Sequence, residues 1–245
     1  MKLEIEIFPT GEEVVEKAAR LFVEIARESI AQRGRFLVAL SGGTTPRDLH
    51  RKLASDEFRS QIDWTKTHIF FGDERAVSGD NEYSNARMAR ESLLDFVPIP
   101  PENIHFMRGD AVPLEDGAKE YGLLLQRFGA LDLIFLGMGD DGHMASLFPH
   151  SPQLHEAKHR CVVTPVSPTE PNLPRLTMTF SFINSARNIC VLVTGKGKAA
   201  RVAQVLPHVK SSTRKTEELP ITNVQPTDGN LIWLLDEAAT SSIVA

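Results

Sequence analysis

The chain has 245 residues, and its 42% hydrophobic and 24% charged residues are typical of a soluble protein with a substantial core. The formal net charge of −5 gives no general attraction to nucleic acids or anionic membranes, so a phosphate partner would need a local cluster of cations. No apolar run approaches membrane-spanning length and the N-terminus has no signal-peptide core, so we expect a cytoplasmic protein that folds as a single domain over residues 1–245.

Strand patterns and helix patterns alternate along the chain. The first half of the chain predicts a strand over 1–7, a helix over 11–34, a strand over 36–40, a helix from 46 past 53, a strand over 67–71 and a helix over 84–94. A short strand over 104–106 and a helix over 113–128 follow. The second half predicts strands over 131–136, 161–164, 174–179 and 188–193, a helix past 198, a strand over 231–235 and a short helix from 236. This alternation favours an α/β fold with a doubly wound, mostly parallel sheet, helices on both faces and right-handed crossovers. Cys161 and Cys190 lie in strand patterns and in no CxxC pair, so we expect both to be reduced core residues.

The strand over 36–40 is followed by a loop of glycines and hydroxyl groups: Ser41, Gly42, Gly43, Thr44 and Thr45. Thr45 is the expected N-cap of the next helix, and Pro46 its first residue. Such a loop at a helix N-terminus binds anions, because free backbone N–H groups point outward and the helix dipole favours negative charge. The alternative is a tight turn without a ligand, and the loop lacks the spacing of a Walker motif.

Basic side chains flank other predicted strands. Arg75 ends the polar segment 72–75, and Arg175 lies immediately before the apolar, β-branched part of the pattern over 174–179. Lys196 and Lys198 lie where a helix begins. Lysines at a helix start are unfavourable to the dipole, which indicates an anion between them and the helix. Each of these cations could instead be a solvated side chain or a surface ion-pair partner.

The loop over 137–149, directly after a buried strand, is the most informative stretch of the sequence. Three glycines and two aspartates make its first half pliable and polar, and His143 follows Asp141 by two residues. An imidazole there is a titratable base near neutral pH. His155 and His159 have the i,i+4 spacing of zinc ligands on a helix, but no HExxH pattern or third ligand accompanies them, so we expect no metal site.

These polar segments should meet, because ligands of doubly wound sheets bind beyond the carboxyl ends of the strands. Segments 41–46, 72–75, 137–149 and 194–198 each follow such an end. Together they supply an anion cradle, cationic side chains and one imidazole. The pattern predicts a pocket that holds a small phosphorylated metabolite by its phosphate while a histidine acts at the other end.

The segments 41–46, 72–75 with 84–85, 137–149, 175–177 and 197–199 resemble, in this order, the motifs of 6-phosphogluconolactonases. The resemblance covers residues 36–200 and is most specific in the DGHxASLFP segment that begins at Asp141. It implies hydrolysis of 6-phospho-D-glucono-1,5-lactone in the pentose phosphate pathway, without cofactor or metal, on a modified Rossmann-like fold shared with glucosamine-6-phosphate deaminases. Met144 stands where the family usually has threonine, and Thr44 where serine is common.

The resemblance also implies roles for individual residues. The phosphate or sugar would be held by Ser41, Gly42, Gly43, Thr44, Thr45, Arg75, Arg175 and Lys198. His143 would be the catalytic base, with Asp141 or Asp73 orienting its imidazole. The expected partner is a phosphosugar lactone, with no nucleic acid or membrane, and the protein would be a monomer or a small homo-oligomer.

Three other functions stay open from the sequence alone. An aminosugar-6-phosphate isomerase or deaminase would use a glutamate in a DGHxAFNEP segment, whereas residues 146–149 offer no carboxylate. A non-catalytic sugar-phosphate sensor would usually add a DNA-binding or partner domain. A Ser-His-Asp hydrolase would need Ser41 or Ser146 as its nucleophile, and neither lies in a GxSxG elbow.

Overall fold

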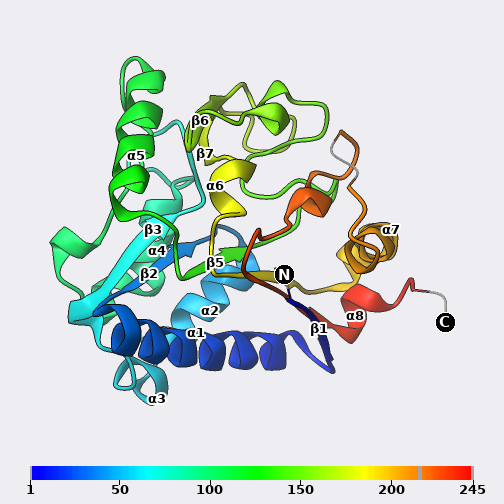
Figure 1. The fold of residues 1–245 in the computed structure, drawn as a ribbon, viewed down its shortest axis with the longest axis horizontal. Helices are drawn as coiled ribbons and strands as arrows, with labels where there is room; N and C mark the ends of the chain where they lie inside the picture. The colour runs from blue at the N-terminus through cyan, green and yellow to red at the C-terminus, as the bar shows by residue number, and fades with distance from the viewer. Residues whose placement is uncertain (1, 215–216, 244–245) are drawn as a thin grey trace.

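The computed structural model describes residues 2–214 and 217–243, and a six-stranded sheet runs through its middle (Figure 1). From one edge to the other, its strands are β1 (Lys2–Phe8), β9 (Asn230–Asp236), β8 (Asn188–Val193), β5 (Leu133–Leu136), β2 (Phe36–Leu40) and β3 (Thr67–Phe71). All neighbouring pairs in this sheet are parallel. The predicted α/β class with a mostly parallel sheet is therefore confirmed.

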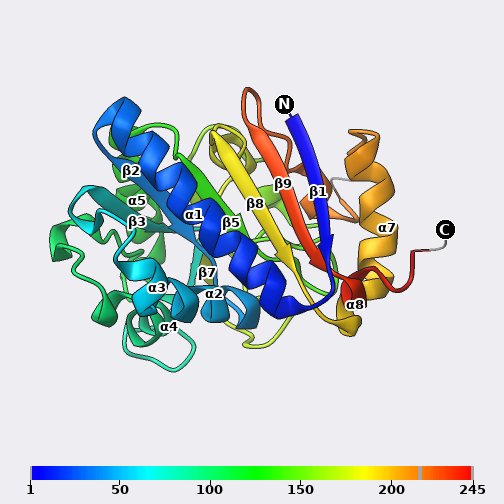
Figure 2. The same ribbon diagram turned by 90° about the horizontal axis from the view of Figure 1, so that it is seen from below.

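Helices cover both faces of this sheet. The helices are α1 (Gly11–Arg33), α2 (Thr44–Ala54), α3 (Asp56–Arg59), α4 (Asn85–Ser92), α5 (Leu114–Phe128), α6 (Phe180–Ile183), α7 (Ala199–Lys210) and α8 (Glu237–Thr240). Figure 2 shows α1 crossing one face, whereas α5 and α6 lie on the other in Figure 1. Every residue of β2 and β5 is buried, as their uninterrupted apolar sequences require of strands covered on both sides.

The predicted capping signals of the first helix are present in the structure. The Thr10 hydroxyl accepts a hydrogen bond from the Glu13 N–H at 3.3 Å, and α1 begins at the next residue after this cap. At the other end Gly34 has φ 74°, a left-handed conformation that glycine adopts without steric cost, and its N–H donates to the Ile30 carbonyl. Local sequence therefore determines both ends of α1.

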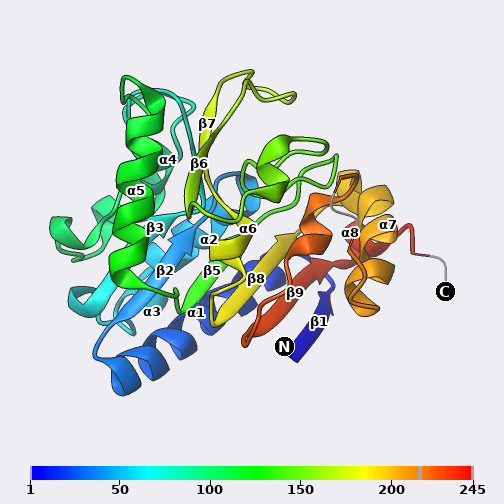
Figure 3. The ribbon, with the colours of Figure 1, turned by 45° about the horizontal axis from the view of Figure 1, so that its top comes forward.

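A second, three-stranded antiparallel sheet was not predicted. It contains β4 (Asp73–Arg75), β7 (Arg175–Met178) and β6 (Cys161–Thr164), in that order. Figure 3 shows β6 and β7 side by side beyond the parallel sheet, next to α5. The chain leaves β3 at Phe71 and re-enters a sheet at Asp73, so a segment expected to be a loop becomes a short strand.

Two further expectations about local structure were wrong, and the spacing of His155 and His159 is not that of a helix. Residues 104–106 do not form a strand, since Ile104 makes only an isolated bridge to Ile69. Helix α2 has Gly43 as its N-cap in place of Thr45, because φ 104° at this glycine lets the helix start at Thr44. His155 ends a 3₁₀ turn, so it does not share a helix with His159.

Short 3₁₀ turns connect several elements, at Trp64–Lys66, Leu94–Phe96, Pro101–Asn103, Pro152–His155, Lys196–Lys198 and Pro220–Asn223. Cys161 and Cys190 are free and buried, and burial raises the pKa of both thiols, that of Cys161 to about 12. Within the described ranges 2–214 and 217–243, no helix combines the length and apolarity needed to span a membrane.

Candidate active site

The loops after β2, β3, β5 and β8 meet the start of β7 around one pocket of about 240 Å³. Its lining residues are Ser41, Gly42, Gly43, Asp73, Arg75, Gly137, Met138, Gly139, His143, Met144, Ala145, Arg175 and Lys198. Most of the residues singled out in the sequence are therefore neighbours in space. Thr44, Thr45 and Asp141 do not line this pocket.

The loop after β2 approaches the pocket through its backbone. A Cβ on Gly42 would overlap the side-chain amide of Asn85, so only glycine fits at this position. No side chain caps the N-terminus of α2, which leaves the N–H groups of its first turn available to a ligand. Thr45 faces elsewhere, since its hydroxyl lies 2.7 Å from that of Thr194.

Two arginines lie opposite each other on the short antiparallel sheet. Arg75 on β4 and Arg175 on β7 are register partners, and like charges directly opposite destabilise a sheet unless an anion lies between them. The Nε atoms of both are buried and, within the described parts of the chain, have no hydrogen-bond partner. Unpaired charged donors in a shared pocket are the mark of an anion-binding site.

Arg175 is held rigidly although it is almost completely buried, at 3% exposed. Its Nη2 donates to the Ser167 hydroxyl at 3.1 Å and to the Pro171 carbonyl at 3.2 Å, and its guanidinium carbon lies 5.4 Å from the centre of the Phe148 ring. Burial lowers the pKa of Arg175, and the nearby Asp73 carboxylate opposes that effect. The guanidinium remains a cation at neutral pH.

Lys198 is the third cation of the pocket, and it comes from the 3₁₀ turn before α7. Its ammonium forms an ion pair with Asp140 in the loop after β5. Lys196, which the sequence also suggested, does not line the pocket. The ion pair joins the loops after β5 and β8 at the pocket rim.

His143 forms a tight pair with Asp141. The Nδ1 atom of the imidazole lies 2.6 Å from Asp141 Oδ1, and the His143 backbone N–H donates to the same oxygen at 3.0 Å. The ring packs against Phe148, with 4.7 Å between ring centres, and its side chain is 18% exposed. Burial alone would raise the pKa of Asp141, but the hydrogen bonds and charge of His143 outweigh burial and lower it. Asp141 therefore orients the imidazole as a carboxylate.

Asp73 does not contact His143, although it lines the same pocket. Its Oδ2 accepts a hydrogen bond from the Ser146 hydroxyl at 2.6 Å, and its Oδ1 accepts one from Asn85 Nδ2 at 3.2 Å. Asp141, and not Asp73, is therefore the carboxylate that reaches the imidazole. Ser146 is fully buried and donates to Asp73, which is incompatible with a role as an exposed nucleophile.

Glu74 is an important residue of this region that the sequence interpretation missed. Its buried carboxylate accepts hydrogen bonds from the backbone N–H groups of Arg75, Asn85 and Ala86, and from the Ser84 hydroxyl, all at 2.7–3.0 Å. Burial raises the pKa of Glu74, while these donors oppose the effect. The contacts fasten β4 to the N-terminus of α4. The signal in the sequence was the acidic residue Glu74 ahead of a helix that begins after Ser84, because a carboxylate can accept hydrogen bonds from the free N–H groups of a helix N-terminus.

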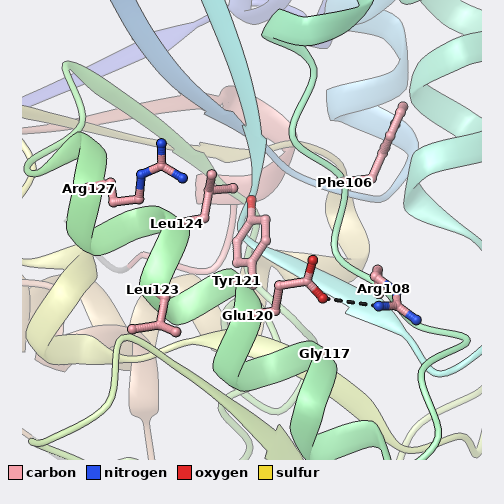
Figure 4. A pocket seen from close by; sticks show the side chains of 8 residues that line it. All are labelled: Phe106, Arg108, Gly117, Glu120, Tyr121, Leu123, Leu124 and Arg127. Atoms are coloured by element: carbon pink, nitrogen blue, oxygen red, sulfur yellow. Dashed lines mark hydrogen bonds and ion pairs between the residues drawn. The ribbon is translucent and has the colours of Figure 1, made fainter.

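A second pocket of about 270 Å³ lies between α5 and the segment around Phe106 (Figure 4). Tyr121 lines it but directs its hydroxyl at the backbone of β3, where it accepts from the Phe71 N–H at 2.9 Å. Arg108 and Glu120 form an exposed ion pair across it. None of the residues singled out in the sequence lies here, and no base or anion cradle accompanies the ion pair.

Comparisons with known proteins show the family to which the chain belongs. A family model described as Glucosamine-6-phosphate isomerases/6-phosphogluconolactonase matches residues 9–233. The chain is 38% identical to proteins named 6-phosphogluconolactonase from Nostoc sp. and Synechocystis sp., with 99% of each chain covered in both cases. The solved structure of 6-phosphogluconolactonase from Trypanosoma brucei is similar with a TM-score of 0.84 at 28% identity, over 99% of both chains.

Proposed function

The chain belongs to the glucosamine-6-phosphate isomerase/6-phosphogluconolactonase family as a 6-phosphogluconolactonase, and we propose that it hydrolyses 6-phospho-D-glucono-1,5-lactone with His143 as the catalytic base. The product would be 6-phospho-D-gluconate, in the oxidative branch of the pentose phosphate pathway. A δ-lactone is an activated cyclic ester, so its hydrolysis needs a positioned water, a base and a group that stabilises the oxyanion.

The pair of Asp141 and His143 supports the choice of base. The carboxylate at 2.6 Å from Nδ1 favours the tautomer that carries its proton on Nδ1, which leaves the lone pair of Nε2 free. Nε2 takes a proton from water as the water oxygen attacks C1, and the imidazolium returns a proton to the ring oxygen as its bond to C1 breaks. Base catalysis of this kind contributes roughly 10²- to 10⁴-fold.

The cations of the pocket support phosphate binding at the other end of the sugar. A sugar phosphate carries about −1.5 to −2 charge at neutral pH. Arg75 and Arg175 offer buried Nε donors that have no partner in the described part of the chain. Lys198 and the start of α2 add positive potential. Holding the phosphate fixes the distance from C1 to the base, and such positioning lowers the activation barrier.

The observation that carries the proposal is that His143, whose imidazole is bonded to a carboxylate, lines the same pocket as two opposed arginines. The test is a coupled assay of the purified protein with freshly generated lactone, corrected for spontaneous ring opening. We expect His143→Ala to keep phosphosugar binding while kcat falls roughly 10²- to 10⁴-fold. A near-normal kcat in His143→Ala would refute the assignment of the base.

The same preparation distinguishes the lactonase from an aminosugar-phosphate deaminase. Residues 146–149 contain no carboxylate in the position that the deaminase motif requires. We therefore expect no ammonia release from glucosamine 6-phosphate. Binding of the lactone without turnover would instead indicate a sugar-phosphate sensor.

A further inference from the structure

Lactone hydrolysis also requires a donor for the oxyanion that forms at C1, and the residues assigned so far do not supply one. His143, oriented by Asp141, accepts and returns the proton, while Arg75 and Arg175 bind the phosphate. The donor must lie in the same pocket as His143 and must have a free hydrogen. The turn over residues 144–147, directly after His143, has both properties.

This turn has an unusual backbone conformation. The Leu147 N–H donates to the Met144 carbonyl at 2.9 Å, which makes Ala145 the first central residue of a tight turn. Ala145 has φ 46°, a left-handed value that normally selects glycine at this position of a turn. A non-glycine residue is strained in this region and persists there only where surrounding contacts enforce it.

Those contacts are present on both sides of Ala145. On the N-terminal side, the His143 N–H is bound to Asp141 Oδ1 at 3.0 Å. On the C-terminal side, the Ser146 N–H donates to the Thr177 hydroxyl at 3.2 Å, and its hydroxyl donates to Asp73. The turn is therefore fixed to the antiparallel sheet at two points, through Thr177 on β7 and through Asp73 on β4.

Most of the N–H groups along this segment donate hydrogen bonds, but that of Ala145 does not within the described residues. Gly142, His143, Ser146 and Leu147 donate to the partners just given or to nearby carbonyls, and Met144 pairs with Leu147 in an isolated bridge. The Ala145 N–H has no partner among residues 2–214 and 217–243. Ala145 and His143 line the same pocket. An unused N–H on a rigid turn is a preorganised donor, which is the property that oxyanion stabilisation requires.

We infer that the backbone N–H of Ala145 donates the hydrogen bond that stabilises the oxyanion, an inference that rests on the proposed lactonase activity. As the water oxygen bonds to C1, the π electrons of the C1 carbonyl move onto its oxygen, which becomes the alkoxide that accepts from this N–H. When the alkoxide re-forms the carbonyl, the bond from C1 to the ring oxygen breaks and that oxygen takes the proton from the His143 imidazolium. No further reactant is needed.

The test replaces the amide at position 145 by an ester. Nonsense suppression with L-lactic acid at this position keeps the methyl side chain and removes only the N–H. Loss of one oxyanion donor typically costs 10²- to 10³-fold, so we expect kcat to fall by about that factor with KM within about threefold of the wild type.

The matched control is the same ester at Ala157, an exposed alanine outside the pocket whose N–H also has no partner within the described residues. This control should retain wild-type kcat and KM. A kcat of the position-145 ester within threefold of the wild type, or a loss expressed in KM alone, overturns the inference about Ala145. Absence of lactone hydrolysis by the wild type overturns the proposed function itself, so the two failures are distinct.

Discussion

His50 is predicted to make the stability of the fold depend on pH. It lies on α2, is 1% exposed, and its Nδ1 is 3.0 Å from the Ser92 hydroxyl on α4. Burial lowers the pKa of His50 from 6.5 to about 4. The contact joins α2 to α4, and because of the lowered pKa it does so with a neutral imidazole.

The sign and size of the effect follow from proton linkage. Between pH 6.5 and pH 4 the unfolded chain protonates His50 whereas the folded chain does not, so the free energy of unfolding falls as the pH is lowered. A pKa difference of this size corresponds to about 3 kcal/mol of unfolding free energy. The protein loses this stabilisation between pH 6.5 and pH 4, and His50 causes no further change at lower pH. The contribution of His50 is independent of pH above the unfolded value.

The assay is urea unfolding at pH values from 7 to 4, followed by fluorescence of the buried Trp64 and Trp233. His50→Gln removes the titrating group, so the wild type should lose about 3 kcal/mol relative to this variant as the pH falls. His159→Gln, at an exposed histidine, is the control and should follow the wild type. A difference between His50→Gln and the wild type that stays constant over the whole range would show that His50 does not cause the dependence.

Three predictions concern the active site. Asp141→Asn should lower kcat about 10²-fold with an unchanged KM, because the amide disturbs the imidazole tautomer. Steady-state kinetics measures both parameters, and a variant with the wild-type kcat would exclude Asp141 as the group that orients the imidazole. Arg175→Lys should weaken the binding of 6-phosphogluconate about tenfold, because lysine cannot reproduce the guanidinium contacts. Isothermal titration measures the change in Kd, and an unchanged Kd would contradict the role of Arg175. Gly139→Ala should lower kcat about 10²-fold, because the added Cβ would overlap the His143 imidazole. Gly197→Ala is the control and should keep the wild-type kcat, because the space around Gly197 is open. Equal kcat values for the two variants would contradict this geometry.

The regular elements were predictable because their signals are local. The strands β2, β3, β6 and β8 match their predicted limits residue by residue, since each is a short run of apolar or β-branched residues between polar segments. The rule that ligands bind beyond the carboxyl ends of parallel strands then correctly placed distant loops in one pocket.

The errors arose where long-range contacts or backbone conformation decide the structure. The pairing of Arg75 with Arg175 joins residues a hundred positions apart, and nothing near Arg75 in the sequence indicates a strand. Thr45 was expected to be the N-cap of α2, but Gly43 takes that position and the Thr45 hydroxyl lies 2.7 Å from that of Thr194.

The sequence alone did not show which aspartate contacts the His143 imidazole. Asp141 and Asp73 were equivalent in the sequence as partners of His143. The backbone N–H of His143 and the ring Nδ1 both reach Asp141 Oδ1, whereas Asp73 is occupied by Ser146 and Asn85. Side-chain direction in a glycine-rich loop depends on φ and ψ values that composition does not specify.

Neighbouring side chains of a strand point to opposite sides, so the three residues of β4 contact two different parts of the molecule. Asp73 and Arg75 face the cavity, while Glu74 between them faces back and anchors α4. Inserting or deleting one amino acid ahead of this tripeptide would swap the two sides, burying an arginine beneath the helix and presenting an anion to the phosphate. Attempts to redesign substrate preference should therefore transplant the tripeptide together with the first turn of α4, and should confine length changes to the surface loop over 76–83.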